Sequence, residues 1–208
     1  VVAMAGERVM FDDKTMMYCP VRELRFEERI VKRLGDILVS VVGLVLTSPI
    51  LLATALAIRL EDGGPVFYRQ KRATYGGRVF EVYKFRSMRA QDGSIHVSAK
   101  KDDDRITKVG HIIRKFRIDE LPQLINVLKS DMSIVGPRPE MLENVEKYTD
   151  DLPEFRYRLR AKAGLTGLAQ IYGKYNTSPR DKLIMDLAYI QQYSVWLDLK
   201  LILRTALV

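Results

Sequence analysis

Two adjacent acidic residues, Asp119 and Glu120, are the strongest candidates for chemistry in this sequence. They precede Leu121-Pro122 and an apolar helical pattern, and proline is favoured in the first turn of a helix. In most sequences, carboxylates at such a position are only helix-end charges, stabilised by the macrodipole by about 0.3–1 kcal/mol. That structural interpretation is the alternative to a catalytic one.

Basic residues surround this acidic pair along the chain. Arg114 and Arg117 come before it, and Arg138 follows between Pro137 and Pro139. A guanidinium can bind phosphate oxygens in a bidentate manner, and flanking prolines reduce the entropy that is lost when it is positioned. Pro-Arg-Pro alone is equally typical of a rigid surface turn. Together with the two carboxylates, the pattern favours phosphate chemistry.

An apolar segment without any charge runs from Ile37 to Ile58. A helix of this length reaches roughly across the hydrocarbon core of a bilayer. A buried helix of a soluble core is the alternative, but such helices usually carry a polar stripe, which this segment lacks. Pro49 removes one backbone hydrogen bond, and the hydroxyls of Thr47 and Ser48 can satisfy the freed carbonyls, so a kink is expected there.

The charges beside this segment leave its topology open. Basic residues flank both ends: Arg29, Lys32 and Arg33 before it, and Arg59, Arg69, Lys71 and Arg72 after it. The positive-inside bias therefore marks neither side as external. A helix that enters the membrane and returns fits this symmetry, and a straight spanning helix with a tolerated kink fits equally well.

The rest of the sequence predicts an α+β fold that is mainly helical. Strands at Val66–Arg72 and Arg78–Phe85, with a turn at Thr74-Tyr75-Gly76-Gly77 between them, form a hairpin that carries Lys84 and Arg86 to its end. Helices, loops and turns should follow in this order: a loop over Ala90–Asp104, a helix through Ile106, Val109, Ile113 and Phe116, a helix through Leu124, Ile125, Val127 and Leu128, a stiff loop over Met132–Pro139, a helix over Glu140–Tyr148, turns at Gly164, Gly167 and Gly173, and helical periodicity from Arg180. The final segment from Trp196 fits a membrane interface or an ordinary core helix.

Composition sets further bounds. With 208 residues, 47% of them hydrophobic, one domain is the default. The 34 Lys and Arg against 26 Asp and Glu give a net charge of +8, which favours an anionic partner such as nucleic acid, lipid headgroups or a nucleotide diphosphate. Cys19 cannot form an internal disulfide, and His96 and His111 supply no metal cluster, so a cytoplasmic active part is expected. The start at Val1 has no signal-peptide pattern and suits a fragment of a longer protein.

From about Glu28 to Ala206 the sequence resembles the monotopic phosphoglycosyl transferases, also called the bacterial sugar transferase family. The matching motifs are Ser48-Pro49, Gln70-Lys71-Arg72, Lys84-Phe85-Arg86-Ser87-Met88, Asp104-Arg105-Ile106-Thr107, Gly110, Arg114, Asp119-Glu120-Leu121-Pro122-Gln123-Leu124, Asn126, Asp131-Met132-Ser133, Gly136-Pro137-Arg138-Pro139-Glu140, Gly164-Leu165-Thr166-Gly167, Ala169-Gln170, Asp186, Tyr189 and Trp196-Leu197-Asp198. Departures from the family pattern occur at Ala73-Thr74, Lys129-Ser130-Asp131, Ala163 and Leu168. They fall in loops, and so they bear on substrate details more than on chemistry.

The resemblance implies a membrane architecture. The apolar helix would be re-entrant, broken at Ser48-Pro49, and accompanied by the small hairpin and by interfacial amphipathic helices. Residues 27–208 would be a monotopic catalytic domain on the cytoplasmic face of the bacterial inner membrane, in contact with phospholipid. Residues 1–26 would be the linker from an upstream domain.

The resemblance also implies a reaction. A sugar 1-phosphate would pass from a nucleoside diphosphate sugar, such as a UDP-sugar, to polyprenyl (undecaprenyl) phosphate and release UMP, as the first membrane step of exopolysaccharide, capsule, O-antigen or glycoconjugate synthesis. Asp119 would be the nucleophile of a ping-pong mechanism and Glu120 a ligand of Mg²⁺. Substrate phosphates would contact Lys84, Arg86, Arg114 and Arg138. A carboxylate at a helix N-terminus beside cations should be ionised, as a nucleophile requires.

Three other classes of protein remain as alternatives. A glycosyltransferase that moves only the sugar would release UDP instead of UMP. A nucleic-acid-binding module explains the positive charge, but no reader motif is recognisable and the long uncharged segment argues against it, so no nucleic-acid partner is expected. A purely structural membrane anchor would not need Asp119. The sugar, the base, the polyprenyl length and whether the protein is a homodimer are left open by the sequence.

Overall fold

A computed structural model of the chain describes residues 6–12, 15–20, 24–89, 103–173, 177–205 and 207, with side chains from residue 24 onward. The fold is α+β and mainly helical, as expected, and its strands in this part form two-stranded sheets. The loop predicted over Ala90–Asp104 falls almost wholly outside the described residues. The N-terminal range expected as a linker contains an antiparallel pair, β1 (Gly6–Asp12) and β2 (Thr15–Pro20).

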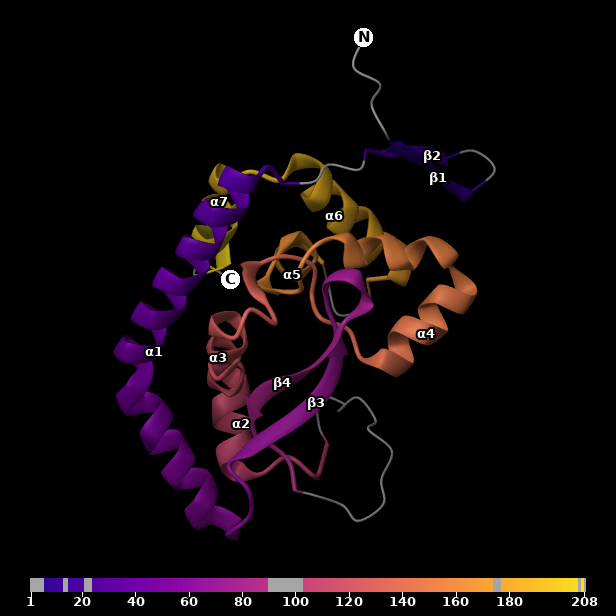
Figure 1. Cartoon of the computed structure of the whole chain (residues 1–208). Coiled ribbons are helices and arrows are strands. Elements are labelled where there is room, and N and C mark those ends of the chain that lie inside the picture. Colours follow the sequence, from indigo (N-terminus) through magenta and orange to yellow (C-terminus); the bar gives the residue numbers. More distant parts are fainter. Residues whose placement is uncertain are drawn as a thin grey trace.

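The longest element is helix α1, Phe26–Asp62, which contains the whole apolar segment. It forms a curved helix along one edge of the molecule, and the hairpin β3–β4 (residues 67–85) and the other helices lie to one side of it (Figure 1). By its length and composition, α1 is long and apolar enough to cross a membrane. Only 11% of its most apolar 18-residue stretch is buried within the protein, so α1 is not a buried core helix. Pro49 lies inside it, and the hydroxyls of Thr47 and Ser48 donate to Gly43 O (2.7 Å) and Val45 O (2.8 Å).

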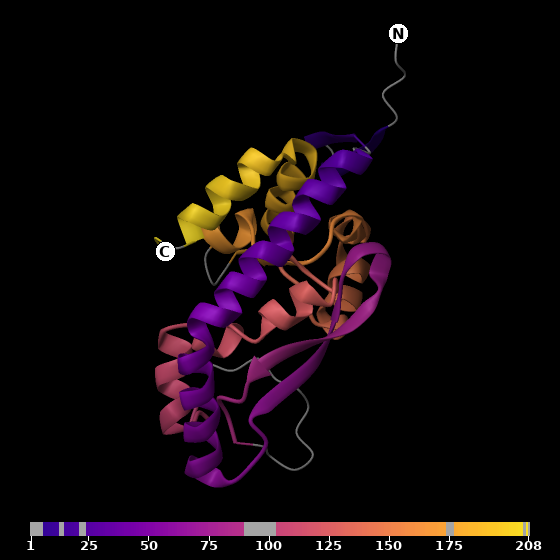
Figure 2. The same ribbon diagram turned by 60° about the vertical axis from the view of Figure 1, so that its left-hand side comes forward.

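Helix α1 runs from one end of the domain to the other (Figure 2), and it contacts the domain in its first half, near Gly43 and at its C-terminal end. In its first half, the buried carboxylate of Asp36 accepts hydrogen bonds from Ser133 Oγ (3.0 Å) and Ile134 N (2.9 Å). At its end, Glu61 accepts from the backbone N–H groups of Lys108 (2.8 Å) and Val109 (3.3 Å). These polar contacts, with buried Ser40, Thr54 and Ile58, hold one narrow face of α1 against the domain.

The predicted hairpin is confirmed, with boundaries shifted by one residue. Strands β3 (Phe67–Ala73) and β4 (Val79–Phe85) pair antiparallel, and Tyr68 lies opposite Lys84. The turn between them needs positive φ at Gly76 (65°) and Gly77 (78°), a backbone conformation that glycine adopts without steric cost. Strand β4, which carries Lys84 near its end, lies beside helices α2 (Lys108–Lys115) and α3 (Gln123–Leu128) (Figure 1).

Helix α2, Lys108–Lys115, confirms the helix predicted around Ile113. Thr107 caps its start by accepting a hydrogen bond from Gly110 N at 2.9 Å. Helix α3 (Gln123–Leu128) contains all four residues of the predicted apolar pattern. The acidic pair, expected at the N-terminus of that helix, lies instead in a separate 3-10 turn just before it, η2 (Ile118–Glu120). Arg117 makes the bend between α2 and this turn with φ of 55°.

Strands β5 (Ser133–Val135) and β6 (Gly164–Thr166) pair in parallel. The prediction of a loop over Met132–Pro139 and a turn at Gly164 was therefore wrong for these two short strands. The pairing depends on close backbone approach, since a Cβ atom on Gly164 would lie 2.1 Å from Gly136 N. That approach joins segments about thirty residues apart and leaves no periodic signal in either.

The C-terminal half is built from helices α4 (Leu142–Asp151), η3 (Pro153–Arg160), α5 (Leu168–Tyr172), α6 (Pro179–Gln192) and α7 (Val195–Thr205). Helix α4 begins two residues later than predicted. Helix α7 has a core face, because Leu201 is buried in the main core. Its opposite face exposes apolar side chains, which leaves the predicted membrane interface open: Val195, Trp196, Leu199 and Leu203.

Candidate functional site

The site is centred on the carboxylate of Glu120, where side chains from three separate elements meet. Lys84 Nζ, from the end of β4, lies 2.7 Å from Glu120 Oε1. Arg138 Nη2, from the loop after β5, lies 3.1 Å from the same oxygen. Three of the predicted site residues are thus brought together.

The ionisation of Glu120 is fixed by these two cations. Burial alone would raise the pKa of Glu120, but the charges of Lys84 and Arg138, and their hydrogen bonds to its carboxylate, lower it to about 2. Glu120 is therefore a permanent anion at physiological pH. Arg138 itself remains exposed, so one side of its guanidinium is available to a ligand.

Asp119 is in a different electrostatic environment. Burial, and next the neighbouring charge of Glu120, raise the pKa of Asp119 above its ordinary value of 3.8, while Lys84 and Arg114 oppose the rise. From the sequence, the neighbouring cations and the helix N-terminus predicted that the charged form of Asp119 is stabilised, which would lower its pKa. The net shift has the opposite sign because burial and the adjacent carboxylate outweigh the cations. An upward shift increases the basicity of a nucleophilic carboxylate.

Arg114 lies near the end of α2. Its charge acts on Asp119, and its Nη1 atom is buried without a hydrogen-bond partner among the described residues. A buried guanidinium nitrogen without a partner is costly unless a ligand supplies one. Its position beside the candidate nucleophile suits an oxygen of a substrate phosphate.

Arg86 makes its contact elsewhere. Its guanidinium pairs with Asp62 at the end of α1, and a Cβ atom on Gly64 would collide with Arg86 Nη1 at 2.0 Å. The missing side chain at Gly64 therefore makes room for this pair. The structure gives Arg86 a role in joining the hairpin to α1, two residues beyond the Lys84 that reaches Glu120.

The sequence analysis did not assign a site role to Arg72. Arg72 Nη1 donates to Pro139 O at 3.2 Å, and Nη2 donates to Gln70 Oε1 at 2.6 Å. Burial lowers the pKa of Arg72, with further effects from Glu140 and Arg138. The antiparallel register puts Arg72 on the same face of the hairpin as Lys84. The alternation of side chains along the two strands was therefore the sequence signal that could have indicated Arg72 as a site residue.

The donor set of this site fits Mg²⁺ in one particular way. No group of three or more His, Cys, Asp or Glu side chains that could hold a metal occurs among the described residues. Mg²⁺ usually binds through one or two carboxylates together with substrate phosphates and water, and needs no protein cage. Glu120 supplies an ionised carboxylate for this mode, with Asp119 beside it.

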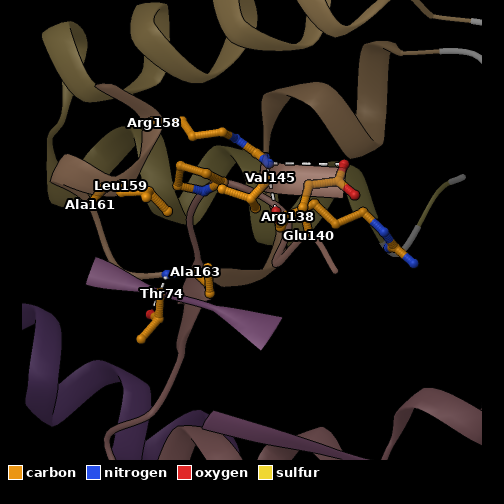
Figure 3. A pocket seen from close by; sticks show the side chains of 10 residues that line it. Thr74, Arg138, Glu140, Val145, Arg158, Leu159, Ala161 and Ala163 are labelled. Carbon is orange, nitrogen blue, oxygen red and sulfur yellow. Dashed lines mark hydrogen bonds and ion pairs between the residues drawn. The ribbon is translucent and has the colours of Figure 1, made fainter. Parts of the chain in front are cut away.

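Two cavities adjoin these residues. A cavity of about 610 Å³ between the middle of α1, the hairpin and α3 has a mainly apolar lining that includes Ser48, Pro49 and Pro122. A far smaller one, about 10 Å³, lies behind Arg138 and is lined by Thr74, Glu140 and Arg158 among others (Figure 3). The larger cavity suits an apolar chain, whereas the smaller one holds little more than a water molecule.

Comparison with known proteins agrees with this architecture. Residues 27–208 match the bacterial sugar transferase family, and the chain belongs to that family. It is 44% identical over 180 residues to the UDP-glucose:undecaprenyl-phosphate glucose-1-phosphate transferase of Caulobacter vibrioides, covering 84% of this chain and 67% of that protein. It is 42% identical over 176 residues to the uncharacterized sugar transferase EpsL of Bacillus subtilis, covering 85% of both chains.

A third relative has a different sugar in its name. The UDP-N-acetylgalactosamine-undecaprenyl-phosphate N-acetylgalactosaminephosphotransferase of Aeromonas hydrophila is 44% identical over 180 residues, which are 84% of this chain and 42% of that protein. The chain thus spans about two thirds of the length of the Caulobacter transferase and less than half of the Aeromonas one. What it shares with them is the part that contains α1 and the site around Glu120.

Proposed function

We propose that this chain transfers a sugar 1-phosphate from a UDP-sugar to a polyprenyl phosphate, such as undecaprenyl phosphate, and releases UMP. The observation that carries this proposal is the convergence of Lys84 and Arg138 on Glu120 beside Asp119. Two residues after Glu120, Pro122 lines a cavity together with the middle of the long apolar helix α1. A cationic site with a nucleophilic carboxylate suits a diphosphate donor. An exposed apolar helix next to it suits a lipid acceptor. The names of two relatives contain this same reaction.

The proposed first step is an attack by a carboxylate oxygen of Asp119 on the phosphorus that bears the sugar. A bond forms between that oxygen and phosphorus, the bond from phosphorus to the bridging oxygen breaks, and UMP leaves. In the second step an oxygen of the lipid phosphate attacks the same phosphorus and releases Asp119. This covalent route divides a two-substrate transfer into two displacements.

The cations make the first step electrostatically feasible. An anionic nucleophile meets an anionic diphosphate, so the oxygens of the donor must be neutralised before Asp119 can approach. Arg114, whose Nη1 is buried without a partner among the described side chains, and the exposed Arg138 supply charge on either side of the acidic pair. Mg²⁺ bound at Glu120 would neutralise further charge on the diphosphate.

Trapping the covalent intermediate tests this function. The protein in phospholipid nanodiscs is incubated with Mg²⁺ and a series of UDP-sugars labelled in the sugar, without the acceptor polyprenyl phosphate. We expect label on the wild-type protein and on Asp150→Asn, which changes an exposed carboxylate on α4, but none on Asp119→Asn. Release of UDP instead of UMP from the complete reaction would overturn the proposal.

We also infer that α1 is re-entrant and that the domain rests on the cytoplasmic face of the bacterial inner membrane. The support is that Asp36 and Glu61, which lie on either side of the uncharged segment of α1, both bond to the same domain. A helix that crossed the bilayer would hold its two ends on opposite sides of it, about 30 Å of hydrocarbon apart. Helix α1 runs without interruption across Pro49. Because Pro49 has no N–H group to donate, it is the position at which we expect the returning helix to bend.

Cysteine labelling from one side of the membrane distinguishes the two topologies. In a Cys19→Ser background, single cysteines replace Phe26 and Leu60, which are exposed at the two ends of α1. With a membrane-impermeant maleimide, we expect both positions to react in inverted vesicles and neither to react in intact spheroplasts. Reaction of one position in each preparation would mean that α1 spans the bilayer.

A further inference from the structure

The loop that carries Arg138 is held through its main-chain carbonyls. Two of its residues are prolines, which have no N–H group, so the loop has few donors with which to join a regular backbone ladder. Each carbonyl instead accepts a hydrogen bond from a different partner: Pro137 O from Gly164 N (2.8 Å), Arg138 O from Arg158 Nη2 (2.8 Å), Pro139 O from Arg72 Nη1 (3.2 Å) and Glu140 O from Ala73 N (3.3 Å). Two of the four donors are arginine side chains.

Arg158 is the more deeply buried of these two arginines, with 3% of its surface exposed. Its Nε atom donates to Asp186 Oδ2 at 2.8 Å, Nη2 lies 2.7 Å from the same oxygen, and Nη1 lies 3.9 Å from Glu140 Oε1. The ring of Phe155 packs 4.8 Å from the guanidinium. Figure 3 shows the guanidinium of Arg158 directed at Glu140, whereas the side chain of Arg138 points away from it.

We propose that Arg158, held by Asp186, is a positioning residue that sets the direction of the Arg138 side chain. Arg158 fixes the main-chain carbonyl of Arg138 through a hydrogen bond. With the main chain fixed in this way, the Arg138 guanidinium is directed to Glu120 and to the donor diphosphate. Arg72 fixes the main-chain carbonyl of Pro139 in the same way. This inference rests on the proposed function, since it assigns Arg158 and Arg72 to the reaction at that site.

The chemistry of arginine explains why a buried cation occupies this position. One rigid planar guanidinium bonds to the Asp186 carboxylate and to a carbonyl at once, so the distance between them is fixed. A lysine keeps the charge but has no fork and can satisfy only part of this geometry. A misplacement of about 1 Å at a reacting group can lower a rate by about 100-fold.

A double variant separates positioning from stability. Arg158→Met alone leaves the Asp186 carboxylate buried without its partner, which destabilises the fold for electrostatic reasons alone. Arg158→Met/Asp186→Leu removes both charges, and replacing a buried ion pair by apolar side chains is often neutral for stability. We expect this double variant to melt near the wild-type temperature while kcat for UMP release falls about 10- to 100-fold, with a much smaller change in KM.

Two further variants sharpen the comparison. Arg158→Lys should fold and should lose less activity than the double variant, because it can retain one of the two contacts. Arg156→Met is the matched control, since Arg156 is exposed on the same η3 segment, two residues away. Wild-type kcat in the double variant, or an equal loss in Arg156→Met, would overturn the proposal.

A cycle with Arg138→Met tests whether Arg158 acts through Arg138. If it does, adding Arg158→Met/Asp186→Leu to Arg138→Met should change kcat by no more than about twofold. Losses that multiply would mean that Arg158 acts by another route. Hydrogen exchange of the peptide around Arg138 should also be faster in the double variant. If the wild type released no UMP, the proposed function would fail, and unchanged exchange would then contradict the positioning separately.

Discussion

Lys84 Nζ and Arg138 Nη2 both contact the same oxygen, Oε1, of Glu120, at 2.7 and 3.1 Å. Lys84 is 36 positions before Glu120 and Arg138 is 18 positions after it, so the contact exists only in the folded chain. With Arg114 close to Asp119, the site holds three cations against two carboxylates. The surplus positive charge is available to an anionic substrate.

Lys84 should be required for donor cleavage. Lys84→Met removes both a contact to Glu120 and a charge that lowers the pKa of Asp119, so kcat/KM for the UDP-sugar should fall by about 100-fold, the scale of a buried charge-assisted contact. The measurement is UMP release under initial-rate conditions. Lys71→Met is the control, because Lys71 is exposed on the paired strand opposite Glu81. Equal activity of the two variants would contradict this role of Lys84.

The pH dependence of donor cleavage should report on Asp119. Attack requires the carboxylate, and burial raises its pKa above 3.8, so kcat/KM should decrease as pH falls through that raised value. Glu120, with a pKa of about 2, stays ionised throughout and does not contribute to this limb. Lys84→Met should move the limb to higher pH, because the lost cation favoured the charged form. A limb at or below pH 3.8 in the wild type would show that Asp119 is not the titrating group.

Asp36 should anchor α1. Asp36→Ala leaves the hydroxyl of Ser133 and the N–H of Ile134 buried without an acceptor, and should lower the free energy of unfolding by about 1–3 kcal/mol. Asp36→Asn retains an oxygen acceptor and should cost less. Thermal inactivation in nanodiscs measures both variants. The control is Glu27→Ala on an exposed position of the same helix, and a similar loss in that variant would argue against a specific anchor.

Gly164 should tolerate no side chain. A Cβ atom there would lie 2.1 Å from Gly136 N, so Gly164→Ala must separate β5 from β6 and displace the loop that begins at Pro137. We expect a loss of stability of about 1–3 kcal/mol, as for overpacking in a core, and a further loss of activity. Gly35→Ala is the control, because nothing lies within 4 Å of its Cβ position and alanine favours a helix by about 0.5–1 kcal/mol. Comparable melting temperatures for the two variants would contradict the close approach of the strands.

Local sequence patterns predicted the elements whose own residues dictate them. The uncharged segment from Ile37 to Ile58 is helical, and the hairpin predicted from alternation and a Gly-Gly turn forms with its strand boundaries shifted by one residue. The pairing of β5 with β6 was missed, because three-residue strands carry too little periodicity. The apolar residues of α3 were predicted as a helix, but the acidic pair expected at its N-terminus lies in the separate 3-10 turn η2.

The sequence by itself determined which residue types are available for phosphate chemistry: Asp119, Glu120, Lys84, Arg114 and Arg138. Only the tertiary structure decided their relations. It placed Lys84 and Arg138 on one carboxylate, paired Arg86 with Asp62, and put Arg158 behind Arg138. It also gave Asp119 a raised pKa where its neighbours in sequence indicated the reverse. The physical reason is that charge and residue type belong to the chain, whereas desolvation and distance arise only when remote segments pack together.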